Sequence, residues 1–98
     1  MDLKEFRASL AAAEPPAGLN IPLRALWLDA KGDWDAAHDT LQADEEGRDS
    51  AWVHAYLHRV EGDLGNAGYW YARAGKRTSD MPLPSEWEEI AAALLARG

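Results

Sequence analysis

The chain has 98 residues, no cysteine and a net charge of −7 at neutral pH. This length predicts one domain, residues 1–98, with a single modest core. The lack of cysteine excludes disulfides, thiolate metal sites and cysteine nucleophiles. The acidic balance predicts no nucleic-acid partner, because binding to a phosphate backbone depends on many Lys and Arg side chains.

No stretch of the sequence is apolar over the length that a bilayer-spanning helix needs. The first residues alternate charged and apolar side chains, a pattern that does not match a secretory signal. We therefore expect a cytoplasmic protein with no membrane partner.

The N-terminal segment, residues 1–19, is predicted to be a capping helix followed by a linker. Asp2 can cap a helix over residues 2–13, whose apolar side chains recur every three or four positions. Pro15, Pro16 and Gly18 end this helix.

Residues 20–47 are predicted to form a first helical hairpin. Asn20 can cap its first helix, and Gly32 supplies the stop. Asp33 can then cap a second helix, in which Trp34, Ala37 and Leu41 face inward.

Residues 48–76 are predicted to repeat this scheme as a second hairpin. Asp49 or Ser50 caps a helix over residues 51–61, and Gly62 ends it. Asp63 caps the next helix, which extends to Ala74.

Residues 77–98 are predicted to be a linker and a C-terminal capping helix. Ser85 and Glu88 have the spacing of a capping box, and the helix is expected to stop at Gly98. We expect Trp70 to pack against this helix, near Trp87. The sequence thus predicts an all-α fold of six helices and no strand.

The two hairpins nearly repeat each other with an offset of thirty residues. The run 25–41 aligns with the run 55–71, so that Gly32-Asp33 matches Gly62-Asp63 and Ala37 matches Ala67. Since one hairpin cannot bury its apolar face alone, this period predicts two stacked helix-turn-helix units.

The pattern Gly-Asp-Trp-x-x-Ala at 32–37, followed by Gly-Asp-Leu-x-x-Ala at 62–67, resembles the tetratricopeptide repeats and their close relatives. The resemblance covers about residues 20–76. It departs from that family in its spacing of thirty rather than thirty-four residues, and in Leu41 where an aromatic residue is usual.

The resemblance implies a scaffold that holds a protein or peptide partner in a concave groove lined by the first helices of the hairpins. The side chains expected to line this groove are Arg24, Trp27, Trp52, Tyr56 and Arg59. Homo-oligomerisation is left open by the sequence.

His54 and His58 lie four positions apart, which places both imidazoles on one helix face. They can pack between helices, line a polar ligand pocket or share a metal ion, for which His38, Glu61 and Asp39 are the nearest further ligand types. If Arg24 and Arg59 face the same cavity, the group suits an anionic ligand. Because two histidines on one helix, without a second pair of strong metal ligands, are a weak signal for a metal site, we assign no metal and no cofactor.

The sequence favours a protein without catalytic activity. Its serines lie at predicted caps or in loops, and none has the context of a nucleophile elbow. The carboxylates are abundant, as on a solvated helix surface, and no phosphate-binding glycine loop accompanies them. The leading hypothesis is an interaction module, and the alternative is a small-ligand or metal-binding protein using the helix face of His54 and His58.

Overall fold

The computed structural model describes residues 1–97. Over these residues all regular secondary structure is helical, with no strand. The prediction of an all-α fold with six α-helices is confirmed. The elements are α1 (Leu3–Ser9), α2 (Ile21–Ala30), α3 (Trp34–Leu41), the 3-10 helix η1 (Gln42–Asp44), α4 (Arg48–Val60), α5 (Leu64–Ala74) and α6 (Leu83–Arg97).

The two Gly-Asp corners fold in the same way. Gly32 and Gly62 have φ angles of +86° and +84°, which a residue with a Cβ adopts only under strain. The next N–H reaches back to the last turn of the helix, from Asp33 to the Leu28 carbonyl at 3.0 Å and from Asp63 to the His58 carbonyl at 2.9 Å. Each aspartate then caps the following helix by accepting a backbone N–H three residues on.

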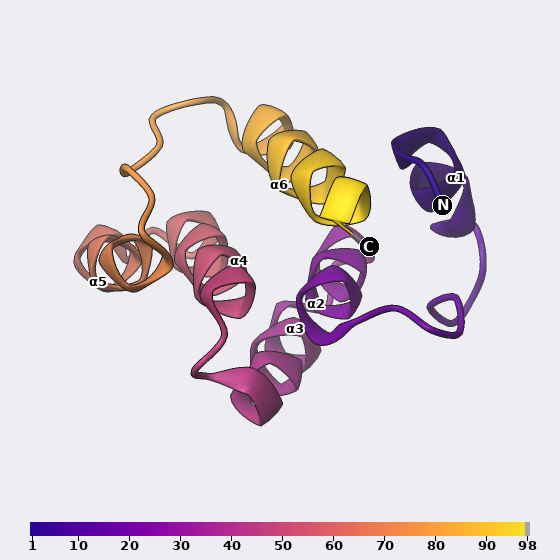
Figure 1. The fold of residues 1–98 in the computed structure, drawn as a ribbon, viewed down its shortest axis with the longest axis horizontal. Coiled ribbons are helices and arrows are strands. Elements are labelled where there is room, and N and C mark those ends of the chain that lie inside the picture. The colour runs from indigo at the N-terminus through magenta and orange to yellow at the C-terminus, as the bar shows by residue number, and fades with distance from the viewer. Residues whose placement is uncertain (98) are drawn as a thin grey trace.

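These corners fold α2 against α3 and α4 against α5 as two helical hairpins. The small residues Ala37 and Ala67 are buried where the helices of each hairpin meet. Helix α4 also contacts α2 and α3, so the hairpins lie against each other (Figure 1).

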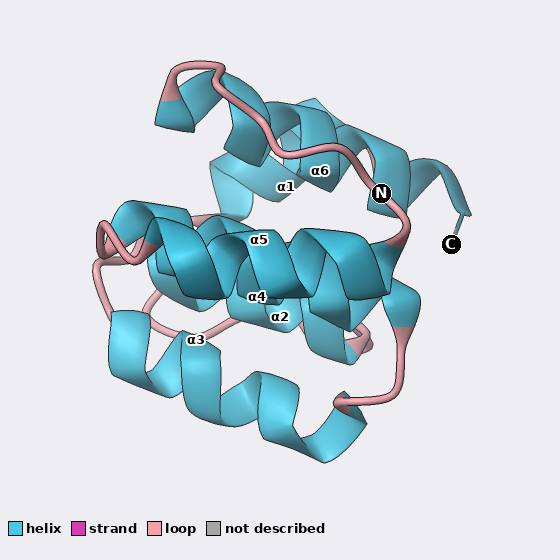
Figure 2. Cartoon of the chain, turned by 90° about the vertical axis from the view of Figure 1, so that its left-hand side faces the viewer, coloured by secondary structure: helices cyan, strands magenta, loops and turns pink. Residues whose placement is uncertain are grey.

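Helix α6 does not continue the series of hairpins but crosses over α2 and α4. In Figure 2, α6 and α1 lie on one side of α4 and α2, while α3 lies on the other. Trp87 anchors this arrangement, because its indole N–H donates to the Leu26 carbonyl at 3.0 Å and its ring stacks on Phe6 of α1.

The expected contact of Trp70 with the C-terminal helix is wrong. Trp70 stacks on His54 with ring centroids 3.9 Å apart. The apolar stripe of α6, which includes Trp87, Ile90 and Leu94, is instead buried against the first helices of the hairpins.

Three helix ends differ from the prediction. Helix α1 ends at Ser9 rather than residue 13, because the backbone bonds that follow it span three residues and close single turns. Helix α4 begins at Arg48 with Gly47 at its N-cap, and Ser50 donates its hydroxyl to Asp44. Helix α6 begins two residues before Ser85, and the predicted stop at Gly98 lies outside the described residues.

None of the helices within residues 1–97 combines the length and the apolar character that crossing a membrane requires.

Candidate functional site

The groove predicted along α2 and α4 is covered by the chain itself. Trp27, Trp52 and Tyr56 are only 1%, 6% and 5% exposed, beneath α1 and α6. Trp27 donates its indole N–H to the hydroxyl of Ser9, the last residue of α1. Arg24 is the one predicted groove residue that is exposed to solvent in the described chain. The expectation of an open groove is therefore wrong, because two capping helices bury the aromatic side chains that would line it.

Arg59 holds α6 in place through a buried carboxylate. Its guanidinium donates to Glu86 at 2.6 Å and to the Met81 carbonyl at 2.7 Å. Glu86 is only 1% exposed, and its second oxygen accepts the Tyr71 hydroxyl at 2.5 Å. Burial and the neighbouring Glu86 carboxylate both raise the pKa of the Tyr71 phenol, which therefore stays neutral.

The four cationic or imidazole groups expected to face one cavity are not brought together. Arg59 points to α6, whereas Arg24 lines a separate surface depression with Arg48 and Arg97. His54 packs against Trp70 on the other side of α4. The proposed anion site of Arg24, His54, His58 and Arg59 is therefore not formed.

A pocket of about 390 Å³ remains between α1, α2, α4 and α6. Tyr56 lies at its wall, so one of the predicted groove residues does line a cavity. The apolar part of the lining consists of Leu10, Ala30, Leu83, Pro84 and Trp87, and the polar part of Arg7, Asp29 and Tyr56.

Asp29 is the chemically distinctive group of this pocket. Burial raises the pKa of its carboxyl from 3.8 to about 6, and it makes no ion pair within residues 1–97. Arg7, the one basic side chain among the lining residues, forms an ion pair with Glu88 at 2.7 Å. Burial and then the Asp29 charge raise the pKa of the Tyr56 phenol. No pattern in the sequence indicates Asp29, because its burial depends on helices that are distant along the chain.

All three histidines of the chain meet on the opposite side of α4. The ring centroid of His38, from α3, lies 5.0 Å from that of His54 and 5.5 Å from that of His58, and the latter two are 6.0 Å apart. Trp34 stacks on His38 and Trp70 on His54, so aromatic rings enclose the histidines. The prediction that His54 and His58 share a face is met, and the structure adds His38 and the two tryptophans. The spacing of Trp34 and His38, one helical turn apart, could have indicated that these two rings stack, but not that they meet the histidines of α4.

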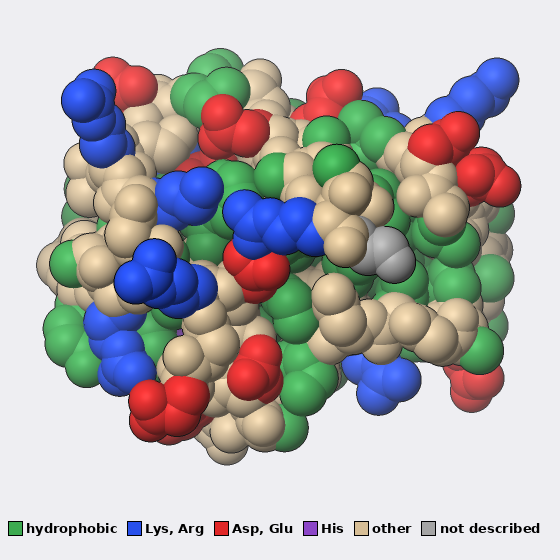
Figure 3. Space-filling model, in the orientation of Figure 1, with side chains coloured by type: hydrophobic (Ala, Val, Ile, Leu, Met, Phe, Trp, Pro, Cys, Tyr) green, Lys and Arg blue, Asp and Glu red, His purple; other side chains and the backbone are tan. Residues whose placement is uncertain are grey.

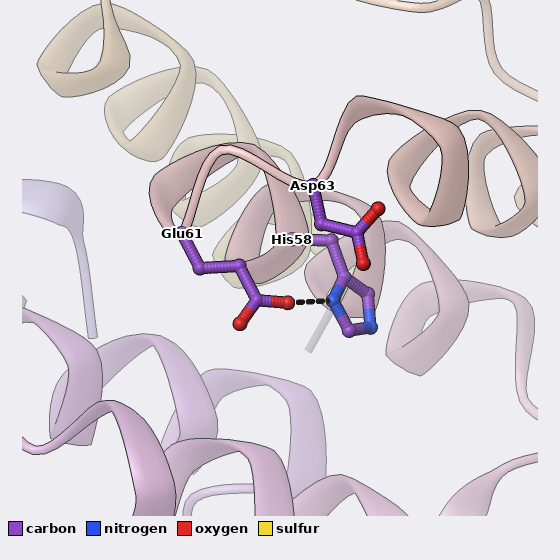
Figure 4. Close-up of side chains that lie close together, drawn as sticks. All are labelled: His58, Glu61 and Asp63. Atoms are coloured by element: carbon purple, nitrogen blue, oxygen red, sulfur yellow. Dashed lines mark hydrogen bonds and ion pairs between the residues drawn. The ribbon is translucent and has the colours of Figure 1, made fainter.

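The three imidazoles differ in their hydrogen bonding. His58 is bonded through Nδ1 to the Glu61 carboxylate at 2.6 Å (Figure 4). This bond places the proton on Nδ1 of a neutral His58 and leaves the lone pair on Nε2. His54 is only 2% exposed, and its Nδ1 has no hydrogen-bond partner. Burial lowers the pKa of His54 from 6.5 to about 4, with further lowering by His38, His58 and Arg73.

Within residues 1–97, another group brings three possible metal-ligand atoms closer together than the three histidines do. Atoms of His58, Glu61 and Asp63 are all within 4.8 Å of one another, at the corner between α4 and α5 (Figure 4). The Asp63 carboxylate already caps α5 through the Asn66 N–H at 3.2 Å. The two carboxylates are on exposed residues, and His58 is buried.

No family model, curated protein or solved structure matches the chain. Its function must therefore be argued from its own residues.

The histidine cluster predicts an acid-sensitive fold. Since the pKa of His54 is about 4 in the folded chain and 6.5 without burial, the unfolded chain binds this proton first as the pH falls. The stability that neutral His54 provides is complete above pH 6.5 and is lost between 6.5 and 4, a decrease on the order of 3 kcal/mol.

This decrease is measurable in Asp29→Asn, by urea denaturation at several pH values with EDTA present. The substitution is needed because the raised pKa of Asp29 has the opposite effect, lowering stability as the pH rises from 3.8 to about 6. The double variant Asp29→Asn, His54→Phe should lose most of the pH dependence in this range. An unchanged profile would show that His54 is not the titrating group.

Proposed function

We propose that this chain is a helical-repeat interaction module, with tetratricopeptide-like hairpins and without catalytic activity, that binds a short segment of a protein partner. The observation that carries this proposal is the pocket between α1, α2, α4 and α6. Pockets that combine an apolar wall with a few polar groups are the usual places of ligand binding. The repeated Gly-Asp corners and paired helices support the repeat architecture.

The lining of the pocket favours one kind of partner segment. Leu83, Pro84 and Trp87 offer an apolar wall, and Asp29 offers a carboxylate without an ion pair in the described residues. A Lys or Arg next to an apolar residue would satisfy both. The net charge of −7 also attracts a basic segment.

On the visible face of the molecule (Figure 3) the charges are mixed, which leaves specificity to the pocket. On the face drawn in Figure 3, basic and acidic side chains lie next to one another. Long-range attraction would then bring a basic segment to the chain, and the apolar contacts would select among such segments.

The test is a titration with two short peptides, followed by nuclear magnetic resonance. Acetyl-Leu-Lys-amide is expected to shift the signal of the Trp87 indole N–H, and acetyl-Leu-Glu-amide is expected to bind at least about tenfold more weakly, which corresponds to about 1.4 kcal/mol. Asp29→Asn should remove this preference for the basic peptide.

Filling the pocket provides a separate check. Ala30 lies at its exposed rim, so Ala30→Phe should block binding of both peptides while the melting temperature stays within a few degrees of the parent. Ala72→Phe, at an exposed position of α5, is the matched control and should bind like the parent. Equal binding by Ala30→Phe and the parent would show that the pocket is not the site.

A further inference from the structure

We propose that His38, His54 and His58 form a binding site for a divalent transition-metal ion of the zinc type, at the junction of α3 and α4. This site is separate from the pocket, since Figure 2 places α3 and α6 on opposite sides of α4. The proposal therefore does not depend on the proposed peptide binding. The three residues are the only histidines of the chain, and they come from both hairpins.

The spacing of the rings fits three imidazoles around one ion. With a metal–nitrogen distance of about 2.0 Å and tetrahedral angles, two ligating rings have centroids roughly 5 Å apart, and wider angles increase this to about 6 Å. The observed separations are 5.0, 5.5 and 6.0 Å. Binding requires the rings of His54 and His58, now parallel within 5°, to turn a nitrogen toward His38.

The bonding state of the rings suits a metal ligand. His58 is bonded through Nδ1 to Glu61, which leaves a lone pair available on Nε2. A carboxylate on the second nitrogen is the usual partner of a metal-ligating histidine and fixes its tautomer. His54 is buried with Nδ1 unpartnered, a polar atom that a ligand would satisfy.

The surroundings favour a cation at this place. His58 lies in the last turn of α4, where the helix dipole is negative. Trp34 and Trp70 stack on His38 and His54 and limit the access of water. Arg73 lies over Trp70 with its guanidinium carbon 5.1 Å from the ring centroid, and its charge opposes a cation. Neutral imidazoles with available lone pairs offset this repulsion by direct coordination.

The carboxylates of Glu61 and Asp63 offer a different site with His58 as a ligand. Their carboxylate oxygens lie within 4.8 Å of a ring nitrogen of His58, but each carboxylate already has a hydrogen-bond partner. Glu61 is bonded to His58, and Asp63 accepts a backbone N–H at the N-terminus of α5. Zinc, copper and nickel favour imidazole, whereas magnesium and calcium favour oxygen ligands. The choice of metal therefore separates the two sites.

The experiment uses the full chain after removal of metal with EDTA and exchange into a non-coordinating buffer at pH 7.5. Zn²⁺ is expected to raise the melting temperature and to bind with one ion per chain by calorimetry, while Mg²⁺ leaves both unchanged. His38→Gln should weaken Zn²⁺ binding by about 100-fold or more, since it removes one of three ligands, and Glu61→Gln by about 10-fold to 100-fold through loss of the bond that orients His58. His38 is half-exposed, so this variant is expected to fold.

Asp63→Asn is the matched control, because it removes the corner carboxylate, keeps a side-chain oxygen that can cap α5 and leaves all three imidazoles in place. It should bind Zn²⁺ like the parent. A second readout is the electron paramagnetic resonance of bound Cu²⁺, in which hyperfine splitting from imidazole nitrogen should decrease in His38→Gln. Absence of Zn²⁺ binding by the parent, or equal Zn²⁺ affinity of His38→Gln and the parent, would overturn the proposal. Binding that responds to Mg²⁺ and is lost in Asp63→Asn would assign the corner carboxylates instead.

Discussion

Glu86→Ala is expected to lower the free energy of unfolding by about 3–5 kcal/mol, because it leaves the Arg59 guanidinium in a mostly buried position without its carboxylate. It also removes the acceptor of the Tyr71 hydroxyl, which is buried with Glu86. A chain of this size has a total stability of about 5–15 kcal/mol, so this single change is expected to bring it close to unfolding. Urea denaturation followed by tryptophan fluorescence measures the effect.

Glu88→Ala is the matched control on the same helix. Glu88 also pairs with an arginine, Arg7, at 2.7 Å, but both side chains of this pair are 51% exposed. Exposed pairs contribute about 0–1 kcal/mol, so this variant should be close to the parent. If Glu86→Ala and Glu88→Ala differ by less than about 1 kcal/mol, the Arg59–Glu86–Tyr71 network does not hold α6.

Trp87→Ala is expected to cost about 3–5 kcal/mol, because it removes a large buried side chain at the point where α6, α1 and α2 meet. The cavity it leaves joins the pocket, which Trp87 lines. Thermal and urea denaturation should both show the loss, and peptide binding in the pocket should decrease with it.

Two further variants separate the causes of this effect. Trp87→Phe keeps most of the buried area but loses the bond to the Leu26 carbonyl, which should cost about 1–2 kcal/mol. Tyr69→Ala removes an aromatic side chain that is 55% exposed and should change the stability by less than about 1 kcal/mol. A Trp87→Ala variant as stable as Tyr69→Ala would show that α6 is not anchored through Trp87.

The sites could be predicted only in part. The face shared by His54 and His58 follows from their spacing on one helix. Their meeting with His38 depends on how α3 lies against α4, and the pocket around Asp29 depends on four helices at once. The capping helices cover most of the face that is predicted to line the groove, which explains why its aromatic residues are buried.

The helices and their corners follow from the amino-acid sequence alone. Asn20, Asp33 and Asp63 cap helices within three residues of themselves, and Gly32 and Gly62 provide the positive φ that ends the preceding helix. Because these interactions join residues that are close in sequence, they can form however the helices pack against one another.

The position of α6, in contrast, depends on contacts between distant parts of the chain. Its apolar stripe would be buried equally by α5 or by the first helices, since hydrophobic burial has no direction. The choice depends on Arg59 with Glu86, 27 residues apart, and on Trp87 with the Leu26 carbonyl, 61 residues apart. Directional bonds between such distant groups form only after the helices have assembled. For that reason the sequence pattern predicted the hairpins and the C-terminal helix, but not where that helix packs.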